Sequence, residues 1–209
     1  MPITRRLLIT AAAVLPVGGT AHAQTAPAAA PDGADPRMAD RALGSPDAKV
    51  LVTEWFSMTC SHCAGFQKDT FPQVRAKLID SGRVRYAWRD YPLDQVALTA
   101  AMVARALPQE RYEPFVSALL ASQDRWAFAR GVNSTDELAK YAALAGMSRE
   151  TFNMTIGDAN LKKAILTAQE AAETKYKVTS TPSFIVNEKL VSGAISFSDF
   201  AKAVDAAAA

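Results

Sequence analysis

Two cysteines, Cys60 and Cys63, are the only cysteines in the chain, and Ser61 and His62 separate them. Residues three apart on a helix lie ~5–6 Å from each other, which is within the Cα range that a disulfide tolerates. At the start of a helix, Cys60 would face unpaired backbone amides and the positive end of the dipole, which favour a thiolate. A purely stabilising disulfide would close a larger loop. The spacing therefore favours thiol–disulfide exchange, with Cys60 as the reactive sulfur and Cys63 as the resolving one.

Two other side chains could adjust the chemistry of these thiols. His62, if protonated, adds positive charge beside Cys60 and stabilises its thiolate; the alternative is a surface histidine without a role. Glu54 lies six positions before Cys60 in an otherwise apolar run, so strand alternation could place it beneath the cysteine pair. Burial would raise the pKa of this carboxyl group, which could then carry a proton to or from Cys63. The alternative is an edge-strand glutamate that faces solvent.

The predicted elements place the cysteine pair between a strand and a helix. In order, they are a strand from about Lys49 to Phe56, a helix after the cysteines that Pro72 kinks, a strand at Arg83–Arg89, helices from Leu93 to about Lys177, strands at Ser183–Val186 and Lys189–Gly193, and a helix at Phe197–Ala206. Ser134 with Glu137, and Ser196 with Asp199, are typical of capping boxes. This order predicts an α/β (α+β) fold with a central mixed β-sheet and an inserted helical subdomain at about 93–177.

The N-terminal 23 residues have the layout of a secretory signal, with a basic start, an apolar middle and an A-x-A cleavage site. The apolar run is shorter than the ~20 residues that span a bilayer, which argues against a membrane anchor. Arg5 and Arg6 are also compatible with a twin-arginine signal. Residues 24–40, rich in Ala, Pro and Asp, are predicted to form a flexible leader before a domain at 41–209.

The composition fits one globular domain of 209 residues, 49% of them hydrophobic. The formal net charge is +2, and the two arginines of the expected signal account for it. A balanced mature charge gives no indication of binding to nucleic acid or to an anionic membrane surface.

Metal binding is the main alternative use of the cysteines. Structural zinc takes four ligands, whereas Cys60, His62 and Cys63 crowd into four residues and His22 lies in the expected signal. A transient copper or zinc site is compatible with this set. Ala64 after Cys63 excludes the haem-attachment pattern, and a Cys–His hydrolase would need an independent histidine. We therefore expect no metal and no cofactor other than a redox-active Cys60–Cys63 disulfide.

The run from Ser45-Pro46-Asp47 through EWFSMTCSHCAGF, then TFPQV and VRYAWRDYPLD, resembles the DsbA-like branch of the thioredoxin superfamily, in particular its short bacterial periplasmic group. The resemblance extends from about Arg41 to the C-terminus and implies a thioredoxin-like fold. It implies that Cys60 is the nucleophile, Cys63 its partner and Glu54 a buried acid. Thr181-Pro182 would form the cis-proline loop that faces the disulfide and binds substrate backbone. Ser61, where many members carry proline, would lie beside the substrate and influence the redox potential.

The resemblance also implies a periplasmic thiol–disulfide oxidoreductase that introduces disulfides into reduced or unfolded exported proteins. A DsbB-like membrane protein would reoxidise it. The alternative is a disulfide isomerase or reductase kept reduced by a DsbD-like partner, with which Ser61 and Thr181 are compatible. Such isomerases often associate through an N-terminal segment, and residues 24–40 are too short and too rich in Pro and Ala for one, so we expect a monomeric oxidase. A third hypothesis is a non-catalytic, metal-binding redox chaperone.

Overall fold

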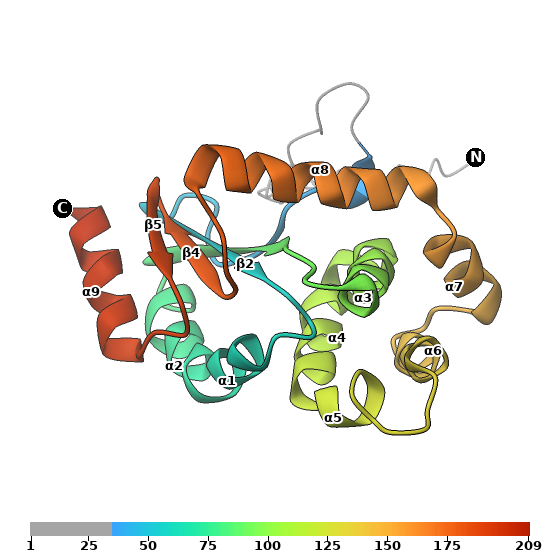
Figure 1. The fold of residues 1–209 in the computed structure, drawn as a ribbon. Helices are drawn as coiled ribbons and strands as arrows, with labels where there is room; N and C mark the ends of the chain where they lie inside the picture. Colours follow the sequence, from blue (N-terminus) through green and yellow to red (C-terminus); the bar gives the residue numbers. More distant parts are fainter. Residues whose placement is uncertain (1–34) are drawn as a thin grey trace, which may run out of the picture.

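A mixed sheet forms the centre of the computed structural model, which describes residues 35–209 (Figure 1). Within these residues the strands are β1 (Arg41–Leu43), β2 (Val50–Phe56), β3 (Val84–Asp90), β4 (Ser183–Val186) and β5 (Lys189–Ser192), in the order β1-β3-β2-β4-β5. β2 and β3 are parallel, and the other neighbours are antiparallel. The predicted mixed sheet is confirmed. The predicted signal and residues 24–34 of the leader lie outside the described residues.

The helices fall into three groups along the chain. The first group is α1 (Ser61–Asp69), α2 (Phe71–Val74) and the π-helical turn η2 (Arg75–Ile79), which connect β2 to β3. The second, between β3 and β4, is α3 (Gln95–Ala106), α4 (Gln109–Ala121), α5 (Gln123–Trp126), α6 (Ser134–Leu144), α7 (Arg149–Ile156) and α8 (Ala159–Tyr176). The last is α9 (Phe197–Ala208). Pro72 lies in the first turn of α2, directly after the break that the sequence predicted.

The sheet separates two layers of helices. α1, α2 and α9 cover one face, α8 crosses the other, and α3–α7 gather beyond one end of the sheet (Figure 1). An aromatic cluster fills the space between the sheet and the first layer, and its members are Phe66, Phe71, Tyr86, Trp88, Phe184 and Phe200. Tyr86 and Trp88 lie two residues apart on β3 and therefore point to this same face. None of the helices within residues 35–209 is long and apolar enough to cross a bilayer.

A buried ion pair attaches the inserted helices to the end of β3. Arg105 of α3 is fully buried, and its Nε lies 2.5 Å from Asp90 Oδ2. Its Nη2 also donates to the Trp88 carbonyl at 3.2 Å. Arg41 of β1 in turn donates from Nη2 to the Arg105 carbonyl at 2.7 Å. These contacts hold the start of the insertion next to the carboxyl end of the parallel strands.

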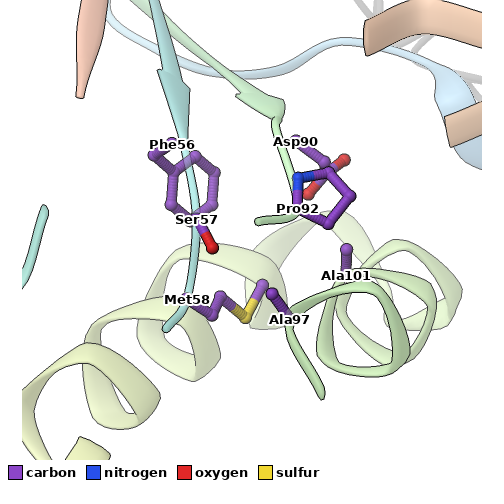
Figure 2. Close-up of a pocket in the computed structure, with 7 residues that line it drawn as sticks. All are labelled: Phe56, Ser57, Met58, Asp90, Pro92, Ala97 and Ala101. Atoms are coloured by element: carbon purple, nitrogen blue, oxygen red, sulfur yellow. The ribbon is translucent and has the colours of Figure 1, made fainter. Parts of the chain in front are cut away.

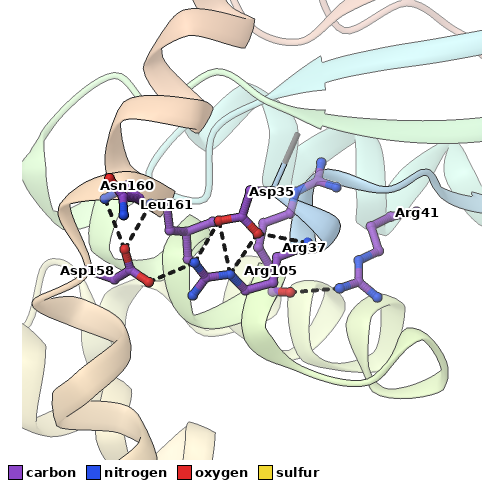
Figure 3. A network of polar contacts seen from close by, with 7 residues as sticks. All are labelled: Asp35, Arg37, Arg41, Arg105, Asp158, Asn160 and Leu161. Atoms are coloured by element: carbon purple, nitrogen blue, oxygen red, sulfur yellow. Dashed lines mark hydrogen bonds and ion pairs between the residues drawn. The ribbon is translucent and has the colours of Figure 1, made fainter. Parts of the chain in front are cut away.

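Residues 35–40, which the sequence assigned to the end of the leader, have a defined structure. Pro36–Met38 form a 3₁₀ turn, η1, which contacts α3 and α8. Arg37 Nη2 lies 2.6 Å from Asp35 Oδ2 and 2.7 Å from Asp158 Oδ2, so it bridges this turn to the start of α8 (Figure 3). Residues 35–40 therefore belong to the folded domain, and β1 is a strand that the sequence did not predict.

One of the two predicted capping boxes is wrong. Asn133, and not Ser134, caps α6: its side chain accepts hydrogen bonds from the amides of Thr135 and Asp136. Ser196 caps α9 as predicted, because its hydroxyl accepts from the Asp199 amide at 3.2 Å. The Asp199 carboxylate accepts from the Ser196 hydroxyl at 2.8 Å.

Candidate active site

The cysteine pair lies where β2 ends and α1 begins. Cys60 is the N-cap residue of α1, with φ −82° and ψ 119°, and Cys63 lies in the first turn. Both cysteines are free thiols; the Cys60 side chain is 7% exposed and the Cys63 side chain is fully buried. An N-cap residue directs its side chain toward the unpaired amides of the first turn. The main-chain N–H groups of His62 and Cys63 accordingly interact with the Cys60 sulfur.

The surroundings of Cys60 stabilise its thiolate. A hydrogen bond from the Cys63 thiol has the largest effect and, with Thr181 and the two helix amides, lowers the pKa of Cys60 to about 5, although burial opposes the shift. Burial raises the pKa of Cys63 well above that of an ordinary thiol, and the negative charges of Glu54 and Cys60 raise it further. The two sulfurs of one helical turn therefore titrate far apart, in opposite directions from the ordinary value.

Glu54 lies on the buried face of β2, beneath the cysteines. In the parallel register it pairs with Trp88, so it shares a face with Trp88 and Tyr86. Its Oε2 accepts a hydrogen bond from the Tyr86 hydroxyl at 2.8 Å, and its side chain is 2% exposed. Burial raises the pKa of this carboxyl group to about 7. The solvent-facing alternative is wrong, and the carboxyl group can gain or lose a proton near neutral pH.

Ser61 and His62 both have exposed side chains at the start of α1. His62 acts on Cys60 through its main-chain N–H, which helps to lower the pKa of the thiol. Its imidazole faces solvent, and the tuning role predicted for this ring stays a prediction. Both side chains lie where a molecule approaching Cys60 along the helix start would meet them.

Thr181 and Pro182 approach Cys60 from a segment 121 residues further along the chain. β4 carries them there because it pairs antiparallel with β2, with Trp55 opposite Ser183. The Thr181–Pro182 peptide bond is cis, as the resemblance implies. The Thr181 carbonyl accepts from Cys60 Sγ at 3.3 Å. The Thr181 hydroxyl is buried without a hydrogen-bond partner in the described structure, so it is available to a thiolate at Cys60.

The loop that leads from β2 to Cys60 is attached to the inserted helices. Thr59 Oγ1 donates to Asp94 Oδ2 at 2.8 Å, and Asp94 also caps α3 by accepting from the Ala97 amide. Figure 2 shows Met58 of this loop lying toward Ala97 of α3. From α5, Gln123 Nε2 donates to the Met58 carbonyl at 2.9 Å and to the Cys60 carbonyl at 3.0 Å. Two helices of the insertion thus hold the turn that carries the reactive sulfur.

Comparisons with known proteins agree with the fold. A family model described as thioredoxin matches residues 37–206. The crystal structure of Wolbachia pipientis alpha-DsbA1 has a TM-score of 0.74 with this chain at 31% identity, over 81% of this chain and 90% of that one. This chain belongs to the DsbA-like branch of the thioredoxin superfamily. A thioredoxin-like oxidoreductase from Silicibacter pomeroyi is similar at 27% identity and a TM-score of 0.65, over 83% and 93% of the two chains.

Curated relatives of this DsbA-like chain carry the name "Putative protein-disulfide oxidoreductase". Those of Rickettsia bellii and Rickettsia felis are each 28% identical, over 149 and 169 residues. The matches cover 71% and 80% of this chain but 57% and 60% of the relatives. The DsbA-like chain therefore spans about three fifths of the length of these relatives. The thioredoxin-like fold predicted from the sequence is confirmed.

The DsbA-like site includes two residues that sequence reasoning missed. Asp94 could have been found, because it lies two residues after Pro92 and directly before an apolar helical pattern, as an N-cap residue does. Gln123 carries no such signal, since its contact with Cys60 joins positions 63 residues apart. Cys60, His62 and Cys63 were considered as ligands only for the alternative of metal binding; no cluster of three or more Cys, His, Asp or Glu side chains suited to a metal ion occurs within residues 35–209.

Proposed function

We propose that this protein is a thiol–disulfide oxidase that introduces disulfides into reduced exported proteins through Cys60 and Cys63. The opposite pKa shifts of the two thiols carry the proposal: about 5 for Cys60, and far above the ordinary range for Cys63. A stabilised thiolate favours the reduced form of the enzyme. An enzyme whose reduced form is stabilised is a strong oxidant of other thiols.

The exchange proceeds in two displacements. A substrate thiolate attacks Cys60 Sγ in the Cys60–Cys63 disulfide, the S–S bond breaks, and Cys63 leaves with the electron pair. Cys63 takes up a proton, and Glu54, a buried carboxyl group with a pKa of about 7 whose charge acts on Cys63, would supply it. A second substrate thiolate then attacks the substrate sulfur of the mixed disulfide, and Cys60 leaves as a thiolate. The substrate loses two electrons, and the enzyme disulfide gains them.

The other residues of the site assist binding and departure in this proposal. The Thr181 carbonyl and the adjoining Pro182 face the sulfur that the substrate attacks, where they would bind the extended substrate backbone. The buried Thr181 hydroxyl would donate to Cys60 when it leaves as a thiolate. The exposed side chains of Ser61 and His62 would contact the substrate or a redox partner.

Export, location and partners belong to the same proposal. The expected signal in residues 1–23 would direct the chain to the bacterial periplasm, where disulfides persist. A DsbB-like membrane protein would reoxidise the dithiol, and the domain would act as a monomer.

The decisive experiment is the reduction potential, measured by equilibrating the protein with glutathione buffers. An oxidase should give a value well above the ~−270 mV of thioredoxin, and a value near that figure would contradict the proposal in favour of a reductase or an isomerase kept reduced. Oxidation of a reduced, unfolded protein should be lost in Cys60→Ser. Tight stoichiometric zinc or copper with no thiol exchange would instead support the metal-binding alternative.

A further inference from the structure

Gln123 is the first residue of α5, and its carboxamide reaches into the turn before α1. Its side chain is 9% exposed. Nε2 donates to the carbonyl oxygens of Met58 and Cys60, at 2.9 and 3.0 Å. The Cys60 carbonyl also accepts the first intrahelical bond, from Ala64 at 3.1 Å. One carboxamide thus satisfies two buried main-chain acceptors on either side of Thr59.

These two hydrogen bonds fix the orientation of the reactive cysteine. Holding a carbonyl fixes the plane of its peptide group. The two planes held here lie before Thr59 and after Cys60, so they restrict the φ and ψ angles of both residues. With the carbonyls held, Cys60 keeps the extended N-cap conformation at φ −82° and ψ 119°. That conformation directs Sγ back toward the N–H groups of the first turn, those of His62 and Cys63.

We propose that Gln123 is a positioning residue of thiol–disulfide exchange, which holds Cys60 at the start of α1 by donating to the Met58 and Cys60 carbonyls. The inference rests on the proposed function, because it assigns Gln123 a part in the same reaction. Gln123 does not touch the reacting sulfur and acts only through the main chain. The helical insertion, by this account, adjusts the redox centre as well as covering one end of the sheet.

A purely structural role for Gln123 makes a different prediction. In that case its loss would lower stability, because two buried carbonyls would lose a donor, and the Cys60 thiol would be unaffected. Gln67 supplies the matched control. It lies on α1 and also contacts the insertion, since its Nε2 donates to Ser117 Oγ of α4 at 2.8 Å, but it holds no carbonyl of the cysteine turn.

The test compares Gln123→Met with Gln67→Met, because methionine keeps the length of glutamine and removes both donors. The pH profile of Cys60 alkylation in the reduced protein is measured together with thermal unfolding. In Gln123→Met the released turn should cost the Cys60 thiolate about one of its hydrogen bonds from the amides of the first turn. The midpoint should then rise by about one pH unit, which is a tenfold lower thiolate fraction below the midpoint. Gln67→Met should leave the midpoint in place.

An unchanged midpoint in Gln123→Met, with a loss of stability like that of Gln67→Met, would overturn the inference. If Gln123→Met does not fold, Gln123→Asn replaces it: the shorter carboxamide keeps its donors but cannot reach both carbonyls, so the midpoint should still rise. The midpoint is measured without any substrate protein. A chain that fails to oxidise reduced proteins, yet shows the shifted midpoint, would contradict the proposed function and leave the positioning role intact.

Discussion

The hydrogen bond from Cys63 to Cys60 has the largest effect on the reactive thiol, and replacing Cys63 tests it. Cys63→Ala removes the donor, whereas Cys63→Ser keeps an O–H donor on a side chain of similar size. A hydrogen bond to a charged group contributes ~1.5–3 kcal/mol, and one pKa unit corresponds to about 1.4 kcal/mol. Removing the donor should therefore raise the pKa of Cys60 from about 5 to about 6–7.

The assay is the rate of Cys60 alkylation by iodoacetamide as a function of pH, checked against the ultraviolet absorbance of the thiolate. Either variant leaves Cys60 as the one thiol of the chain, so both signals report Cys60 alone. The wild-type midpoint is expected at about 5, and Cys63→Ser should remain close to it. The alanine variant should show its midpoint about one to two units higher.

Two results would refute this reasoning. An alanine variant that still titrates near 5 would mean that the helix amides and Thr181 stabilise the thiolate without the Cys63 donor. A serine variant that rises as far as alanine would mean that an O–H group cannot replace the thiol, and that the packing of Cys63 rather than its proton determines the shift. A higher midpoint in alanine alone supports the donor.

Two further predictions concern pH. The reduction potential should fall by ~59 mV per pH unit below about pH 5 and by ~30 mV per unit above it. The slope halves because reduction takes up only one proton once Cys60 remains a thiolate. Potentials measured in buffers of stepped pH would show no change of slope near pH 5 if the pKa of Cys60 were that of an ordinary thiol. Because the folded protein raises the pKa of Glu54 from 4.5 to about 7, this residue's contribution to the free energy of unfolding is fully present below pH 4.5 and is lost as the pH rises through about 7. The contribution is ~3 kcal/mol. Urea unfolding of the oxidised protein should show that decline, and Glu54→Gln should abolish it; an equal decline in both proteins would assign it to another group.

Local patterns were sufficient to predict the part of the fold that carries the cysteines. β2 alternates, and Glu54 lies between the buried residues Val52 and Phe56 on the same face, so its inward orientation follows from a period of two. The ends of β2, β3 and β4 were predicted to within a residue, β3 from its alternation and β4 from a short apolar run that is buried at every position. Cys60 was placed at a helix start because an apolar strand precedes the cysteines and a helical pattern follows them, and Cys60 is indeed the N-cap residue of α1.

Contacts between distant segments could not be predicted in this way. β1 has three residues, and it is a strand only because β3 offers a free edge to pair with. The bridge from Arg37 to Asp158 joins positions 121 residues apart, and neither residue signals the other. At α6 the two adjacent residues Asn133 and Ser134 are both good N-caps, so the sequence could not decide which one leaves the helix.

The buried charges of the site constrain one another. Cys63 lowers the pKa of Cys60 only while it keeps its own proton, and the charge of Glu54 helps to keep that proton in place. When Cys63 leaves the disulfide as a thiolate, however, its charge and that of an ionised Glu54 would lie close together in a buried site, which is costly. A carboxyl group with a pKa of about 7 can deliver a proton at that moment and regain one from solvent at neutral pH. In the proposed exchange, Glu54 would therefore reset Cys63 as the donor that stabilises Cys60, and one buried carboxyl group would link the departure of one sulfur to the low pKa of the other.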